Sequence, residues 1–168
     1  MSSVGSRDGA PPPAVRQDER RQGVTADFVT MTIAGQLFGI PVLQVQDVLG
    51  PQRITRIPLA PPEVAGSLNL RGRIVTAIDV RLRLGLEPRP HDGKNMSIVV
   101  DHGGELYSLM VDSVGEVVSV SDAAFERNPA TLDPVWRDVS TGIYRMNEQL
   151  LIVLDIARLL NFAAREAA

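Results

Sequence analysis

Residues 74–80 read Ile-Val-Thr-Ala-Ile-Asp-Val, and residues 150–156 read Leu-Leu-Ile-Val-Leu-Asp-Ile. Each stretch is a short apolar run that reaches an aspartate. Runs of this length that are rich in Ile, Val and Leu are typical of β-strands buried on both faces. We therefore expect a central strand at residues 74–78 and a second central strand at residues 150–154.

A short amphipathic helix is expected directly after each strand. Asp79 and Asp155 stand where their side chains would accept hydrogen bonds from the unpaired N–H groups of the first helical turn. Gly85 and Asn161 stand where the helices should end, because both residue types tolerate left-handed backbone. The two halves of the chain thus end in the same way.

The two stretches belong to an internal repeat. At an offset of 76 residues, segment 66–84 aligns with segment 142–160, and at an offset of 69 residues, segment 36–48 aligns with segment 105–117. Two alignments in the same order indicate that one small unit occurs twice. The two copies are expected near residues 27–90 and 95–162.

Two β-hairpins are predicted from β-type runs that are separated by turn residues. The first hairpin joins residues 28–33 to 37–40, and the second joins residues 97–100 to 106–111. Pro41 is expected to end the first hairpin, because proline has no N–H to donate to a ladder.

The segment after Pro41 has its apolar residues at a different spacing. Val42, Val45, Val48 and Leu49 fall at positions i, i+3, i+6 and i+7. This spacing predicts one or two helical turns.

The size of the repeat indicates how the copies are arranged. About 60 residues are marginal for an independent core, so the copies should pack on each other. Of the 168 residues, 44% are hydrophobic and only 4% are aromatic, so the shared core should be aliphatic. The predicted fold is mainly β, with two small β-barrels, short helices, a C-terminal helix and a groove between the barrels.

The two ends of the chain differ in texture from the repeat. Residues 1–26 carry mixed charges, a Pro-Pro-Pro run and few large apolar residues, so we expect a disordered tail. Residues 163–168 are expected to form a short tail. The chain has no apolar run long enough for a signal peptide or a membrane span, and we expect a soluble cytoplasmic protein.

The composition argues against an enzyme and against a cofactor. There is no cysteine, and the two histidines, His91 and His102, lie in a linker and in a hairpin turn. Asp112 and Glu116 are spaced like an acid–base pair on a helix, but a surface face explains them better. We therefore predict no catalytic residue, no metal site and no cofactor.

One dense basic cluster consists of Arg71, Arg73, Arg81 and Arg83. A solvated face is the ordinary explanation of such a cluster. Nucleic acid is not the expected partner, because the net charge is −3 and the chain has a single lysine. Protein recognition suits arginine better, since its planar fork pairs carboxylates and stacks at interfaces.

The segment Asn69-Leu70-Arg71-Gly72, followed by the apolar strand and by Asp79-Val80-Arg81, resembles the CheW family of bacterial chemotaxis adaptors. The likeness extends to residues 45–48, to residues 113–117 and to the aspartate at the end of the second central strand. The resemblance implies two five-stranded SH3-like barrels. It also implies a non-enzymatic adaptor that couples transmembrane chemoreceptors to the histidine kinase CheA, through that kinase's regulatory domain.

The same resemblance implies the binding residues. Arg71 matches a functionally important arginine of the family, and Asp47 stands where many members place glutamate. The receptor tip is expected in the groove, at Val45, Asp47, Val48, Asn69, Leu70, Arg71 and Gly72. Kinase contact is expected at the barrel ends. The second copy has Arg145 to Glu148 in place of the Asn69–Gly72 motif, as expected if the motif serves a partner and not the fold.

Three other interpretations stay open from the residues alone. The chain could be an adaptor in a chemosensory-like array with a non-motility output, an isolated regulatory domain of a CheA-type kinase, or a small enzyme. The leading interpretation is a cytoplasmic adaptor recruited to receptor arrays, with no nucleic-acid partner and no membrane insertion.

Overall fold

The structure is a computed structural model that describes residues 25–88 and 95–161. The expected tails at 1–26 and 163–168 lie outside the described residues, apart from Thr25 and Ala26. These two residues are the first two of the first strand. Within the described residues, no helix is long and apolar enough to cross a membrane.

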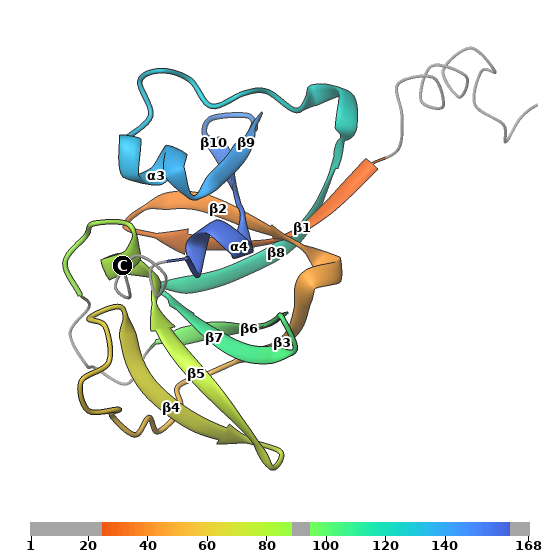
Figure 1. Ribbon diagram of the computed structural model, residues 1–168. Helices are drawn as coiled ribbons and strands as arrows, with labels where there is room; N and C mark the ends of the chain where they lie inside the picture. Colours follow the sequence, from red (N-terminus) through yellow and green to blue (C-terminus); the bar gives the residue numbers. More distant parts are fainter. Residues whose placement is uncertain (1–24, 89–94, 162–168) are drawn as a thin grey trace, which may run out of the picture.

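Ten strands form two five-stranded sheets (Figure 1). Sheet 1 has the order β8 (Ser113–Ser121), β1 (Thr25–Ile33), β2 (Gln36–Pro41), β10 (Leu150–Leu154) and β9 (Ser140–Arg145). Sheet 2 has the order β3 (Val45–Leu49), β6 (Met96–His102), β7 (Glu105–Val111), β5 (Arg73–Asp79) and β4 (Val64–Leu70). The short helices are η2 (Val42–Gln44), α2 (Val80–Arg83), η3 (Asp122–Ala124), α3 (Pro134–Asp138) and α4 (Ile156–Leu159).

The internal repeat is visible in the strand order. Each strand of sheet 2 has an equivalent in sheet 1 that lies 69 or 76 residues away in the sequence. The equivalent strands stand in the same order in the two sheets. Each sheet also contains one parallel pair, β5 with β7 in sheet 2 and β10 with β2 in sheet 1. The two halves of the chain therefore form equivalent structures.

The sheets do not coincide with the two copies along the chain. The β1–β2 hairpin of the first copy lies in sheet 1 with three strands of the second copy, and the β6–β7 hairpin lies in sheet 2 with three strands of the first. The expectation that each copy makes a unit of its own is thus wrong. An isolated hairpin is marginally stable and needs further strands, which here come from the other copy.

The mainly β fold with few short helices is confirmed, and so are both predicted hairpins. Pro41 is the last residue of β2, as predicted. The helical turns expected over residues 42–49 are wrong beyond the three-residue η2. Val45–Leu49 is instead the strand β3, because pairing with β6 outweighs the local apolar spacing.

The two predicted helix caps are confirmed. The Asp79 side chain accepts a hydrogen bond from Leu82 N at 3.3 Å, and the Asp155 side chain accepts one from Arg158 N at 3.1 Å. Gly85 follows α2 with φ of 78°, the left-handed conformation expected there.

The repeated glycines Gly66 and Gly142 are required by a close approach of another segment. Their φ values are 151° and 159°. A Cβ on Gly66 would collide with the carbonyl of Thr55, and one on Gly142 would collide with the Phe125 ring. A second strand-like segment therefore crosses each sheet edge at the same place.

The core confirms a shared and largely aliphatic interface. The main cluster lies between the sheets and draws on both, with Met31, Phe38, Ile78, Ile98 and Ile152 among its fully buried members. Two smaller clusters fill the other faces of the sheets. The α4 helix, which contributes to the main cluster, lies where the two sheets meet (Figure 1).

The β5 strand is less buried than its apolar sequence predicts. Val75, Ala77 and Ile78 are fully buried, but Ile74 is 68% exposed. The β4–β5 hairpin extends away from the rest of the molecule, so the first residues of β5 lie beyond the core (Figure 1). The matching strand β10 is buried over most of its length, as predicted.

Candidate partner-binding site

The Asn69–Gly72 motif forms the turn between β4 and β5. Leu70 pairs with Arg73, so Arg71 and Gly72 are the two central residues of the turn. Their φ values are 52° and 84°, which is the type I′ geometry that matches the twist of a hairpin. The Asn69 side chain accepts a hydrogen bond from Gly72 N at 3.0 Å. The motif therefore builds a defined turn that presents Arg71.

The turn brings Arg71 to Asp47, which lies on β3 at the opposite edge of sheet 2. Arg71 Nη1 is 2.9 Å from Asp47 Oδ2. The Arg71 side chain is 75% exposed and that of Asp47 is 24% exposed. An exposed ion pair of this kind contributes little to folding. The guanidinium keeps further N–H donors that a partner could use.

Asp47 is held in place by its own backbone environment. Its Oδ1 accepts a hydrogen bond from Val48 N at 2.8 Å. Its Oδ2 is shielded from solvent and has no partner with hydrogen-bond geometry, although it lies beside Arg71. The ion pair with Arg71 compensates the charge of this shielded oxygen, so Asp47 orients the Arg71 guanidinium at the surface.

The other predicted site residues divide into surface and core. Val48 is 41% exposed, and Asn69 and Gly72 are exposed as well. Val45 and Leu70 are half-buried, with Val45 against the main cluster and Leu70 against the smaller cluster of sheet 2. The structure thus brings the ion pair and exposed residues of β3 and the turn to one sheet, while Val45 and Leu70 mainly support them.

Two exposed apolar side chains near the site are absent from the sequence prediction. Leu43 lies in η2, two residues before β3 begins, and is 95% exposed. Ile74 pairs with Asn69 across the hairpin, which places it beside the predicted turn. Ile74 follows Gly72 by only two residues, so its place in the sequence could have marked it as a neighbour of the motif. Nothing in the local pattern marks Leu43 as exposed.

The basic cluster is not one solvated face. Arg71 and Arg73 are exposed, but Arg83 is buried and donates to two backbone carbonyls. Arg81 is half-buried and makes two hydrogen bonds to Asp112, which raise the pKa of Arg81 above its ordinary value. The α2 helix lies against the second half of the chain, and this packing removes both of its arginines from the surface cluster.

The described residues contain no group of three or more His, Asp and Glu side chains arranged to hold a metal ion. Asp112 is engaged with Arg81 and with the backbone of Ala34. Asp112 therefore joins α2 to the β1–β2 turn.

The molecule is thus a two-sheet β-scaffold that carries an exposed ion pair with apolar neighbours on a hairpin turn and an edge strand, a combination typical of surfaces that bind other proteins. The chain belongs to the CheW-like domain family, whose sequence model matches residues 27–164.

Relatives of known function agree with this assignment. The chemotaxis protein CheW of Klebsiella aerogenes is 30% identical over 138 residues, which are 82% of this chain and 83% of the relative. The chemotaxis protein CheW of Helicobacter pylori is 26% identical over 133 residues, or 79% and 80% of the two chains. The predicted family resemblance is confirmed.

A solved structure supports the fold. The crystal structure of the scaffolding protein TtCheW from Thermoanaerobacter tengcongensis aligns with a TM-score of 0.70 and 28% identity, over 78% of this chain and 89% of that chain. Family, relatives and structure together show a chemotaxis coupling scaffold.

Proposed function

We propose that the protein is a non-enzymatic adaptor that joins the cytoplasmic tip of a chemoreceptor to the regulatory domain of a CheA-type histidine kinase. It would act in the cytoplasm, within a receptor array. The observation that carries the proposal is the exposed Arg71–Asp47 pair, which the Asn69–Gly72 turn presents beside exposed apolar side chains.

The receptor tip would bind at this pair. Arg71 offers N–H donors in a planar fork, and its ion pair with Asp47 holds that fork beside β3. Val48 supplies exposed apolar area on the same strand as Asp47. Apolar contact would provide most of the affinity, while the two charged groups would select the partner.

The kinase regulatory domain would bind at an end of a sheet. Ile74 is an exposed apolar side chain at the protruding end of sheet 2, and Arg73 beside it is exposed as well. An apolar side chain flanked by arginine is typical of the centre of a protein interface.

We further propose that each sheet curves into an SH3-like barrel. Two observations in sheet 2 support this idea. Its small core cluster lies on one face only, and the Arg71–Asp47 pair joins the β4–β5 turn to β3, an edge strand at the other side of the sheet. Such a contact requires strong curvature of the sheet.

Calorimetry with a receptor tip and with a kinase regulatory domain tests the proposal. Both should bind the folded protein. Arg71→Ala should weaken binding of the receptor tip by about tenfold, equivalent to about 1.4 kcal/mol, and Asp47→Ala should act in the same direction. The double variant should cost less than the sum of the single variants, because the two residues contact each other.

Arg137→Ala is the matched control, because Arg137 is an exposed arginine on α3, a helix outside sheet 2 and its proposed binding residues. Its binding should equal that of the unchanged protein. Failure of the folded protein to bind either partner would overturn the proposed function.

A further inference from the structure

The two sheets are joined mainly by apolar contact. The main cluster between them consists of buried hydrophobic side chains from both sheets. Apolar attraction is non-directional, so it holds two layers together without by itself setting the angle between them. Polar contacts with defined geometry also cross the junction, and four of them are made by the two arginines of α2.

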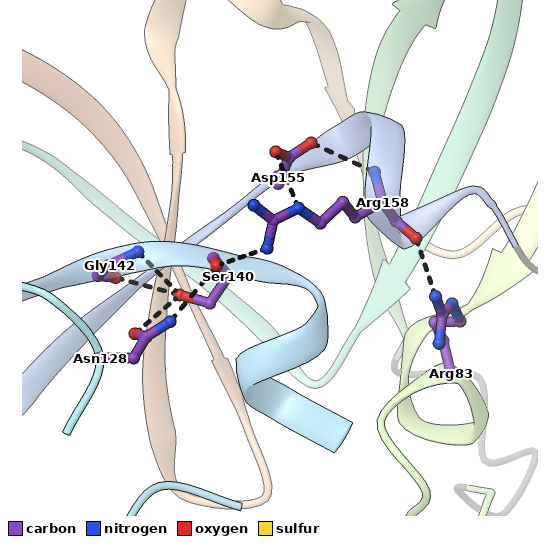
Figure 2. Close-up of polar contacts among 6 residues, drawn as sticks. All are labelled: Arg83, Asn128, Ser140, Gly142, Asp155 and Arg158. Atoms are coloured by element: carbon purple, nitrogen blue, oxygen red, sulfur yellow. Dashed lines mark hydrogen bonds and ion pairs between the residues drawn. The ribbon is translucent and has the colours of Figure 1, made fainter. Parts of the chain in front are cut away.

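Arg83, the last residue of α2, contacts the end of α4 (Figure 2). Its Nε donates to Leu159 O at 2.7 Å, and its Nη2 donates to Arg158 O at 2.8 Å. Only 5% of Arg83 is exposed. Because α2 continues from β5 of sheet 2 and α4 continues from β10 of sheet 1, this planar two-pronged contact joins the sheets.

Arg81 makes a second contact from the same helix. Its Nε and Nη2 donate to the two carboxylate oxygens of Asp112, at 2.9 and 2.8 Å. Asp112 Oδ2 also accepts from Ala34 N in the β1–β2 turn of sheet 1, at 2.9 Å. Helix α2 thus reaches sheet 1 at two separate places, and each contact has fixed bidentate geometry.

The contact made by Arg83 continues into sheet 1. The Arg158 side chain pairs with Asp155 at 3.6 Å and donates to Ser140 O at 3.2 Å. The Asn128 side chain donates to the same carbonyl, and the Ser140 hydroxyl bonds to Gly142 (Figure 2). The end of α4 is therefore hydrogen-bonded to β9 and keeps a fixed position relative to sheet 1.

The repeat shows that this device is specific to one copy. The position equivalent to Arg83 is Leu159, a fully buried leucine in the main cluster. The symmetric scaffold therefore has an apolar side chain at this place in one copy and a buried arginine in the other. A leucine is compatible with the helix, so the fold does not by itself require arginine at residue 83.

We propose that α2 is a clasp that sets the orientation of sheet 1 relative to sheet 2, with Arg83 as the main positioning residue and Arg81 as the second. The apolar cluster holds the two sheets together, and the contacts of α2 fix the angle between them. Surfaces on different sheets are thereby held at one angle.

Distance measurements between spin labels test the clasp. The chain has no cysteine, so labels can be attached through two introduced cysteines without background. His102 in sheet 2 and Glu148 at the β9–β10 connection of sheet 1 are exposed and give a between-sheet pair. Glu116 on β8 and Glu148 give a within-sheet control pair across sheet 1.

Double electron–electron resonance should give a narrow between-sheet distance distribution in the parent. Arg83→Leu should broaden or shift that distribution and leave the within-sheet distribution unchanged. Leucine fills the site with an apolar side chain, and such replacements of buried charges often preserve stability. Arg137→Leu, at an exposed arginine, should change neither distribution.

Two results would overturn the clasp. One is a between-sheet distribution in folded Arg83→Leu that equals the parent. The other is equal broadening of both pairs, which would indicate general loosening. If Arg83→Leu does not fold, Arg83→Lys decides by the same criteria, because lysine keeps the charge but loses the two-pronged geometry. None of these measurements requires a receptor or a kinase.

Discussion

The β4–β5 turn of the first copy and the β9–β10 connection of the second copy occupy equivalent places in two equivalent sheets. In the first, Arg71 and Gly72 are the central residues, and Arg71 pairs with Asp47 of an edge strand. In the second, the corresponding residues are Asn147 and Glu148, flanked by a hydrogen bond from Met146 N to Gln149 O. The same scaffold thus carries different chemistry at its two ends.

The nearest arginine in the second copy, Arg145, also forms an ion pair, but with a different element. Its Nε is 3.0 Å from Glu126, which lies on the segment that crosses the edge of sheet 1. Arg145 therefore fastens a loop to a strand, while Arg71 stands at a turn beside exposed apolar residues. Duplication supplies the framework, and a few surface substitutions give its two ends different ion pairs and different exposed residues.

The largest effects are expected in the core that the copies share. Ile78→Ala and Leu154→Ala remove equivalent buried side chains of β5 and β10, and each should lower the free energy of unfolding by about 2–5 kcal/mol. Chemical denaturation monitors both variants. A large loss for one and almost none for the other would contradict the structural equivalence of the copies.

Smaller losses are expected at the two glycines of the repeat. Gly66→Ala and Gly142→Ala place a Cβ against a crossing segment at positive φ, and the backbone strain alone costs about 1–3 kcal/mol. Gly103→Ala is the matched control, since its φ is 63° and nothing lies within 4 Å of an added Cβ. If the control loses as much stability as the other two, the close approach is not the cause.

The two arginines should differ in binding and not in stability. Arg71→Ala and Arg145→Ala should each change the free energy of unfolding by only about 0.5 kcal/mol, because both side chains are largely exposed. Binding of a receptor tip should weaken for Arg71→Ala alone. Equal weakening in both variants would remove the distinction between the two ends.

The smallest effects concern two tyrosines, one in each sheet. Burial raises the pKa of Tyr107 and of Tyr144 above 10.0, and a hydrogen bond to Glu105 adds to the shift of Tyr107. The folded state favours the protonated phenol, so this stabilisation is present below pH 10 and is lost as the pH rises through the folded pKa. Ultraviolet titration should detect both shifts.

Glu105→Gln separates the two tyrosines. It should lower the pKa of Tyr107 towards its ordinary value and leave that of Tyr144 unchanged, because the second shift arises mainly from burial. A change in both titrations would show that the sheets are electrostatically coupled.

Much of the framework was predictable because its signals are local. The hairpins, Pro41 at the end of a strand and the aspartate caps depend on residues close together along the chain. Residues 42–49 were predicted incorrectly, because apolar spacing over eight residues is ambiguous and pairing with β6 decided the outcome. The exposure of Ile74 depended on how far the hairpin extends beyond the core.

The candidate site was predictable as a set of residues but not as a geometry. The family resemblance marked Asp47 and Arg71, which are far apart in the sequence. Only the tertiary arrangement of β3 and the β4–β5 turn brings their charged groups to 2.9 Å. The burial of Arg83 gave no local signal, because its partners are carbonyls at the end of a helix in the other copy.

The amino-acid sequence by itself determined that the protein is a duplicated β-unit with an aliphatic core, and that one copy carries a distinctive turn. These properties follow from periodicity, turn chemistry and self-similarity, which act over short distances along the chain. The tertiary structure alone decided that the copies exchange their hairpins, that α2 contacts sheet 1 and that Arg71 meets Asp47. These outcomes depend on which distant strands and helices satisfy one another's hydrogen bonds and apolar faces once the whole chain is packed.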